Sequence, residues 1–191
     1  MSIGVSEKLM TAEEFLALPD DGTERMLLRG RLWEKPMTKR NRWHCRVENR
    51  IGQLISNWLD SVGRPIGEVY SGEAGFRLSS DTVVGIDVAY ADHSVATRDS
   101  DETTMLEGSP ILAVEILSPN DKQDEINAKI DDYLAAGVRF VWIVDTHFET
   151  VVVHQPGQTP EMFAGDEELV CEPEMPGFRV KARHIFNRFK N

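Results

Sequence analysis

Apolar residues recur along the chain with two different spacings, and these predict alternating helices and strands. Residues 41–62 follow the 3.6-residue period of an amphipathic helix, which Gly63 and Pro65 end. A second helix is predicted over 122–136, where Gly137 ends it. Nearer the start, a capping box at residues 11–14 predicts a short helix reaching about residue 18. A small hairpin should follow it, over residues 25–28 and 32–34.

The remaining apolar segments are short, and this length is typical of strands. Those at 85–91 and 111–117 are continuous apart from one carboxylate each, as in interior strands covered on both faces. Residues 92–109 and the acidic segment 161–176 predict surface loops. The whole pattern predicts one mixed α/β domain over residues 1–191, with a central sheet between helices. Strands are predicted at 66–70, 74–78, 83–91, 111–117, 139–145 and 150–154, with a short strand and terminal helix over 178–189.

Composition is that of a globular protein, but the charge is strongly acidic. Hydrophobic residues make up 41% of the chain and charged residues 28%. The net charge of −11 argues against tight non-specific binding to DNA, because Lys and Arg drive that binding by neutralising phosphates. An acidic chain that binds DNA needs a local basic patch.

Cysteine usage and the N-terminus indicate a cytoplasmic protein. The two cysteines, Cys45 and Cys171, lack the spacing of a zinc site and predict reduced, mostly buried thiols. No apolar run reaches membrane-spanning length, and the first residues lack a signal-peptide pattern.

Two acidic residues interrupt the buried strands and are the main candidates for chemistry. Asp87 lies within 83–91 and Glu115 within 111–117. Burying an unpaired carboxylate is costly, so a metal, a cation or several hydrogen bonds must compensate. If the two strands are neighbours, both carboxylates can share one ion, and oxygen ligands favour Mg²⁺ or Mn²⁺. The alternative is that backbone N–H groups or a cation such as Arg77 satisfy them.

Lys129 is the candidate cation. It lies at the edge of the apolar stripe of helix 122–136, with Tyr133 one turn later on the same flank. From that position its ammonium can reach over the sheet and stabilise negative charge on a phosphate. The alternative is an exposed lysine paired with Glu125 on its own helix.

Three further residues are candidates for the surroundings of the site. His44 and Glu48 are one turn apart on the inward face of helix 41–62, and Glu73 precedes a predicted strand. Glu73 is a possible third metal ligand, while His44, Glu48 and Tyr133 would form a supporting shell. The alternatives are that His44 is a structural residue of the core and that Glu73 is a solvated residue of a turn.

Several of these segments together resemble the Uma-type restriction-endonuclease family of the PD-(D/E)XK nuclease superfamily. The residues that carry the resemblance extend over nearly the whole chain. They are the blocks 72–78 (GEAGFRL), 86–90 (IDVAY), 114–121 (VEILSPND) and 136–145 (AGVRFVWIVD), with Gly30, His44, Lys129, Tyr133 and the closing 176–178 (PGF).

The resemblance implies a restriction-endonuclease-like αβββαβ core, a divalent metal and hydrolysis of phosphodiester bonds. Asp87 matches the first acidic position of the family motif and Glu115 the second. The chain departs from the motif in two places, because Ile86 replaces the proline before the aspartate and Leu117 occupies the usual lysine position. The resemblance implies that Lys129, from the following helix, supplies the missing ammonium.

Three functions are therefore open. The first is a Mg²⁺-dependent endonuclease acting on DNA, expected to be a homodimer because cleavage of both strands commonly uses two sites. The second is a non-catalytic interaction module on the nuclease scaffold, which the acidity and the relocated lysine favour. The third is a phosphohydrolase acting on small nucleotides, which suits an acidic protein better than a long duplex does.

Overall fold

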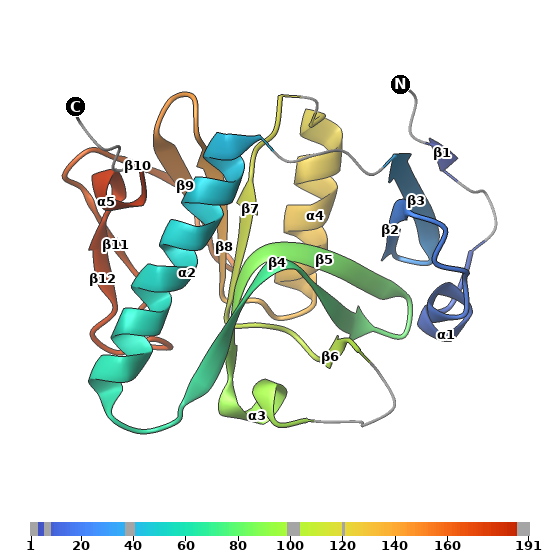
Figure 1. The fold of residues 1–191 in the computed structure, drawn as a ribbon, viewed down its shortest axis with the longest axis horizontal. Coiled ribbons are helices and arrows are strands. Elements are labelled where there is room, and N and C mark those ends of the chain that lie inside the picture. Colours follow the sequence, from blue (N-terminus) through green and yellow to red (C-terminus); the bar gives the residue numbers. More distant parts are fainter. Residues whose placement is uncertain (1–3, 6–8, 37–40, 99–103, 120, 187–191) are drawn as a thin grey trace.

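The chain forms a single large twisted sheet with helices on both faces (Figure 1). This computed structural model describes residues 4–5, 9–36, 41–98, 104–119 and 121–186. The ten-stranded sheet has the order β1-β3-β2-β5-β7-β8-β9-β10, with β4 paired to β5 and β6 to β4, while β11 and β12 form a separate pair. The elements are β1 (Gly4–Val5), α1 (Ala12–Leu16), β2 (Thr23–Leu28), β3 (Arg31–Pro36), α2 (Arg42–Val62), β4 (Gly67–Ser79), β5 (Thr82–Asp92), α3 (His93–Ala96), β6 (Leu106–Glu107), β7 (Leu112–Ile116), α4 (Gln123–Ala135), β8 (Phe140–Asp145), β9 (Thr150–His154), β10 (Glu161–Ala164), β11 (Glu168–Val170), β12 (Arg179–Lys181) and α5 (Ala182–Phe186).

The predicted αβββαβ core is confirmed. It consists of α2, β4, β5, β7, α4 and β8, in this order along the chain. β4, β5 and β7 are antiparallel neighbours, whereas β7 and β8 are parallel and are joined by α4. A parallel pair needs a long crossover connection, which explains why α4 lies between these two strands.

The two helices cover opposite faces of the sheet, because successive strand residues alternate between them. On one face, Val88 and Tyr90 of β5 pack in one cluster with the apolar stripe of α2. On the other face, Ala89 and Ala91 pack in a second cluster with α4. The stripe of α2 consists of Val47, Ile51, Ile55 and Trp58, and that of α4 includes Ile130 and Tyr133.

The two strands predicted at 66–70 and 74–78 are one strand, β4, with a β-bulge between them. Ser71 pairs with Val88 and Ala74 with Ile86, so that Gly72 and Glu73 both lie opposite the single residue Asp87. The glycine-rich sequence around 72 indicated a turn, but antiparallel pairing continues past it on both sides. Bulges of this kind bend a strand and redirect a side chain, and they are frequent beside active sites.

Two segments predicted as loops contain regular structure. Within 92–109, the described residues form α3, which Asp92 caps, and β6, which pairs with β4. Segment 161–176 contains β10 and β11, and its Leu169, Cys171 and Met175 are completely buried. The sequence did not indicate these three core positions, because they lie among the many charged residues of 161–176.

The remaining sequence predictions are largely confirmed. Thr11 and Glu14 form the predicted capping box of α1, and β2 and β3 form the predicted hairpin. The short strand and helix expected at the C-terminal end are β12 and α5, although residues 187–189 lie outside the described ranges. Cys171 is buried as predicted, but Cys45 is exposed because it lies on the outer side of α2. Within the described residues, no helix has the length and apolar character needed to cross a membrane.

Candidate active site

Asp87 is a buried carboxylate held from two directions. It lies on β5 opposite the bulge of β4, and only 4% of its surface is exposed. One carboxylate oxygen lies 3.2 Å from His44 Nε2 of α2, and the other accepts a hydrogen bond of 2.8 Å from the backbone N–H of Ile116 on β7. These contacts fix the side chain in place and offset the cost of burying its charge.

Glu115 is the second carboxylate, on the neighbouring strand. It follows the Val88–Val114 pair of β5 and β7, and so lies beside Asp87. One Glu115 oxygen lies 2.7 Å from Lys129 Nζ and the other accepts a hydrogen bond of 2.6 Å from the Tyr133 hydroxyl. Both partners come from α4, one turn apart, as the helical period predicted.

The protonation of these residues follows from burial and from one another's charge. Burial, and then the Asp87 charge, raises the pKa of Glu115, while the Lys129 ammonium opposes the rise. Burial on its own would lower the pKa of Lys129, but the adjacent Glu115 carboxylate outweighs it and raises that pKa above its ordinary value. Burial and the Glu115 charge raise the pKa of Tyr133 well above its ordinary value. At neutral pH, Lys129 is therefore a cation and Tyr133 a neutral donor.

A single pocket connects the candidate residues. Asp87, Glu115, Lys129 and Glu73 all line it. Glu73 adopts a left-handed backbone conformation with a φ of 59°, which is uncommon for a residue other than glycine. The bulge thus places Glu73 at the mouth of the pocket. The rest of the lining comes from Met26, Ile116, Leu117, Asp121, Glu125 and Ile126.

The supporting residues predicted from the sequence also lie here. His44 is buried and lies between Asp87 and Glu48, whose Oε2 is 3.7 Å from His44 Nε2. A Cβ atom at Gly72 would lie 3.9 Å from Glu48 Oε1, so Glu48 borders the bulge. The structure therefore brings together all seven of the predicted residues, which are His44, Glu48, Glu73, Asp87, Glu115, Lys129 and Tyr133.

Among the described residues, one structural alternative occurs in part, because a backbone N–H satisfies one oxygen of Asp87, but the alternatives that involve Arg77 and Glu125 do not occur. Arg77 forms ion pairs with Glu13 and Glu107 and not with the site carboxylates. Glu125 pairs with Lys122 at 3.3 Å, whereas Lys129 pairs with Glu115.

Sequence reasoning missed three residues that line the pocket. Asp121 and Glu125 read as ordinary polar residues at the start of a helix, and Met26 as part of a hairpin. A signal for the first two existed, because they precede Lys129 by eight and four residues and so lie near its face of α4. Met26 carried no such signal.

The site residues fit a magnesium-type ion. The carboxylate oxygens of Asp87 and Glu115 are held by His44, the Ile116 N–H, Lys129 and Tyr133, and carboxylate oxygens are ligands that Mg²⁺ prefers. Across the described residues, no three His, Cys, Asp or Glu side chains converge closely enough to hold an ion by themselves. Mg²⁺ commonly takes one or two carboxylates and completes its shell with water and substrate phosphate, which matches this pair.

Comparisons with known proteins agree with the fold and with the predicted family. A family model described as "Uma2: Putative restriction endonuclease" matches residues 12–183. Among solved structures, the chain is similar to one described as a putative nuclease belonging to DUF820 from Anabaena variabilis ATCC 29413. That match has a TM-score of 0.77 and 22% identity, and covers 93% of this chain and 97% of the other. At this identity the likeness establishes the shared fold. A comparison with curated proteins found no match.

Proposed function

The chain belongs to the Uma2 family, and on this basis we propose that it is a metal-dependent endonuclease that hydrolyses phosphodiester bonds of DNA. The observation that carries the proposal is the meeting of Asp87 and Glu115 in one pocket, with Lys129 Nζ 2.7 Å from Glu115. An acidic pair beside a fixed ammonium is the arrangement needed to bind a cation and a phosphate together.

Each residue has a distinct part in the proposed reaction. Asp87 and Glu115 would hold Mg²⁺ or Mn²⁺, with Glu73 as the third candidate ligand. The ion, when bound, lowers the pKa of water and polarises the phosphate. Lys129 stabilises the negative charge that develops on the phosphate oxygens.

The supporting residues act through these groups. His44 holds one oxygen of Asp87, and Tyr133 holds one oxygen of Glu115. Such contacts orient ligands and typically change metal affinity or activity by 10- to 100-fold when they are removed.

Metal binding is tested by thermal stability with and without Asp87. We expect Mg²⁺ at about 100 times its Kd to stabilise the wild type by about 2.7 kcal/mol, which raises Tm by several degrees. Asp87→Asn keeps the shape of the side chain and removes the charge, so the Mg²⁺-dependent rise should be lost. Differential scanning calorimetry with MgCl₂ and MnCl₂ series measures both proteins.

Asp60→Asn is the matched control. Asp60 is exposed near the far end of α2, and its substitution should leave the Mg²⁺ response unchanged. Equal stabilisation of wild type and Asp87→Asn would contradict the proposed site. If the metal binds but DNA remains intact, a non-catalytic module is the better description, whereas hydrolysis of nucleotides alone would indicate a small-phosphate hydrolase.

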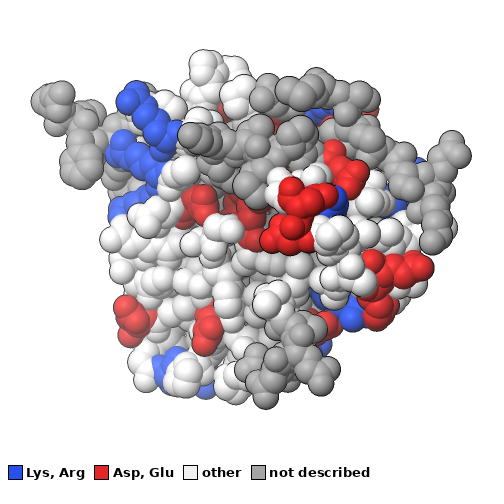
Figure 2. All heavy atoms as spheres, turned by 45° about the vertical axis from the view of Figure 1, so that its right-hand side comes forward, with Lys and Arg blue, Asp and Glu red and all other residues white. Residues whose placement is uncertain are grey.

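DNA as the substrate is supported by a basic stripe on an otherwise acidic protein. Arg42, Arg46 and Arg50 follow one another at four-residue spacing and so lie along one flank of α2. Arg42 lies over the ring of Trp43 at 4.4 Å, and Arg50 donates a hydrogen bond of 3.0 Å to the backbone of His184. A column of basic side chains is visible over the N-terminal half of α2, at the upper left of Figure 2, beside acidic side chains near the centre of this face.

The arginine stripe is linked to the site through α2 and through a neighbouring pocket. It lies on the same helix as His44, which contacts Asp87. Trp43 borders a second pocket, which shares Leu117 with the acidic one. Positions 42 and 46 lie about 160° around the helix from position 44, so we propose that the phosphate backbone passes from the stripe over Trp43 to reach the acidic pocket. Local cations of this kind offset the net charge of −11.

The stripe should determine the salt dependence of DNA binding. Arg42→Gln/Arg46→Gln removes two cations, so the slope of log K against log salt should become less steep by about 1.8 if each contacts a phosphate. Fluorescence anisotropy of a labelled duplex in EDTA at several NaCl concentrations measures this without cleavage. Arg64→Gln, at the other end of α2, should leave the slope unchanged. An unaltered slope in the double variant would place the DNA elsewhere.

We further propose that residues 1–191 act as one domain, as a homodimer and in the cytoplasm. The dimer is supported by the need for two sites when both strands of a duplex are cut. The location is supported by the cysteine content, which lacks the spacing of a disulfide framework.

A further inference from the structure

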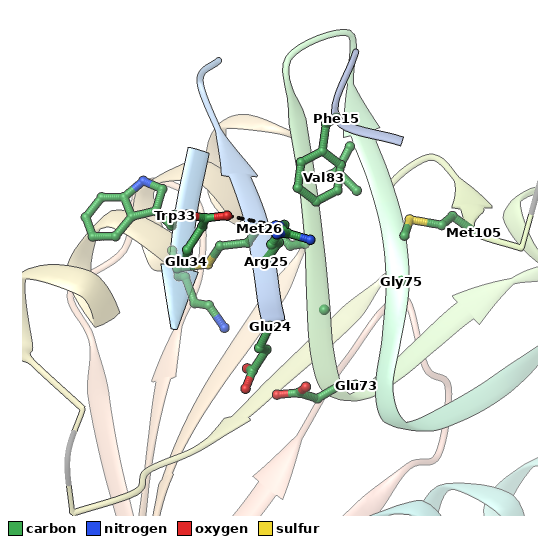
Figure 3. Close-up of a pocket in the computed structure, with 13 residues that line it drawn as sticks. Phe15, Glu24, Arg25, Met26, Trp33, Glu34, Glu73, Gly75, Val83 and Met105 are labelled. Atoms are coloured by element: carbon green, nitrogen blue, oxygen red, sulfur yellow. Dashed lines mark hydrogen bonds and ion pairs between the residues drawn. The ribbon is translucent and has the colours of Figure 1, made fainter. Parts of the chain in front are cut away.

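The central sheet is split between β2 and β5. These strands pair at Leu27 and Val83, and a pocket follows next to that pair. Residues 24–26 of β2 line one side of it, and residues 83–85 of β5 line the other. Figure 3 shows the hairpin of β2 and β3 on one side and β4 and β5 on the other. We call this pocket the β2–β5 slot.

The slot is mainly apolar inside. Apolar side chains form much of its lining, and among them only Met26 also lines the proposed metal site. They include Phe15, Met26, Trp33, Val83 and Met105.

At two paired glycines, the wall of the slot consists of backbone without side chains. Gly75 and Gly85 face each other on β4 and β5, and both line the slot. A Cβ atom at Gly75 would lie only 3.0 Å from the sulfur of Met105, so Met105 packs directly against the backbone here. The absence of side chains at both glycines therefore lets Met105 form this part of the lining, and Met105 is a flexible side chain against which a flat group can pack.

The slot is continuous with the proposed metal site. Three residues, Met26, Glu73 and Lys129, line both pockets. In Figure 3 the carboxylates of Glu24 and Glu73 point toward one another from the two sides of the opening. A ligand can therefore place one part in the slot and the part bonded to it beside Lys129 and the two site carboxylates.

The charges of the slot indicate which part of a nucleotide can enter it. Glu24, Glu34 and Glu73 line it. Its two cations are both paired, Arg25 with Glu34 at 2.8 Å and Lys129 with Glu115 at 2.7 Å. Carboxylates repel a phosphate but accept hydrogen bonds from the exocyclic amino groups of bases. An apolar slot with acidic residues thus suits a base, while the phosphate remains at Lys129.

We propose that the β2–β5 slot binds one unstacked nucleobase of the DNA strand, next to the phosphate held at Asp87, Glu115 and Lys129. This inference rests on the proposed function, since the phosphate position comes from it. Its chemistry is stacking on aromatic and methionine side chains, with amino-bearing bases preferred over thymine.

The test compares two small ligands that differ only by the base. Deoxycytidine 5′-monophosphate and 2-deoxyribose 5-phosphate are titrated in Mg²⁺, with Kd measured by ligand-observed NMR. The nucleotide should bind about tenfold more tightly, the ratio expected for one stacking contact. Thymidine 5′-monophosphate, which has no amino group, should bind more weakly than the cytidine nucleotide.

Variants locate the base in the slot. Trp33→Leu and Met105→Ala should each reduce the nucleotide-to-sugar-phosphate affinity ratio at least threefold, with little change for the sugar phosphate alone. Met162→Ala is the matched control, because Met162 is 66% exposed on β10 at the other edge of the sheet. Circular dichroism confirms that each variant is folded.

The outcomes separate this inference from the proposed function. A base-dependent ratio that both slot variants reduce supports the slot, even if no DNA is cleaved. Equal affinities for nucleotide and sugar phosphate overturn it, even if DNA is cleaved in Mg²⁺. A ratio that survives both substitutions also overturns it, and equal affinities of the two nucleotides overturn the role of the carboxylates.

Discussion

Lys129→Met should lower Mg²⁺-dependent DNA cleavage by about 10²- to 10³-fold, the loss that follows removal of one fixed electrostatic contact to a transition state. The ammonium is held by Glu115 at 2.7 Å in a largely buried position, where its charge acts more strongly than in water. Methionine has a similar length but provides no charge and no donor. A plasmid-nicking time course with purified protein measures the rate.

Loss of Lys129 also leaves Glu115 without its cation, so stability must be measured beside activity. We expect Lys129→Met to lower the free energy of unfolding by about 2 kcal/mol, because a buried acceptor loses its partner. Adding Glu115→Gln to this variant removes the unpaired charge and should restore part of the stability, without restoring cleavage.

Lys122→Met is the matched control for activity. Lys122 lies at the start of the same helix, with 57% of its side chain exposed, and pairs only with Glu125 among the contacts described. The same substitution there should leave the cleavage rate within twofold of wild type. A Lys129→Met protein that cuts DNA at the wild-type rate would show that the ammonium has no part in the reaction.

Gly67→Ala should destabilise the fold by about 3 kcal/mol, at the upper end of the cost of inserting a methyl group into a packed region. Gly67 begins β4 opposite Asp92. A Cβ atom there would lie 2.2 Å from the Ala91 carbonyl oxygen and 2.8 Å from the Tyr90 ring. Backbone must move to accommodate it, so Tm should fall by roughly 6–12 °C, which calorimetry without metal measures.

A second glycine gives the opposite expectation for the same substitution. Gly52 lies inside α2, and a Cβ atom there meets nothing within 4 Å. Gly52→Ala should therefore stabilise the protein by about 0.5–1 kcal/mol, because alanine favours the helix. Equal effects of the two substitutions would show that space at Gly67 does not determine the outcome.

The sequence alone determined the elements whose signal is local. The 3.6-residue period of α2 and α4 and the apolar runs of β5, β7 and β8 are properties of neighbouring residues, so they could be read directly. Asp87 and Glu115 stood out for the same reason, since a carboxylate inside an apolar strand is costly wherever the strand packs. Lys129 lies at the edge of the apolar stripe of its helix, and this position indicated that its ammonium could extend over the sheet.

Only the tertiary structure decided which groups meet. His44 contacts Asp87 across 43 positions of sequence, and the bulge that brings Glu73 to the pocket arises from the pairing of β4 with β5. β10 was hidden because it is only four residues long and lies in an acidic segment, and pairing with β9 supplies its stability. The β2–β5 slot likewise exists only where two strands diverge. Period and composition report the surroundings of a residue along the chain, whereas partners, register and cavities depend on which distant surfaces are buried together.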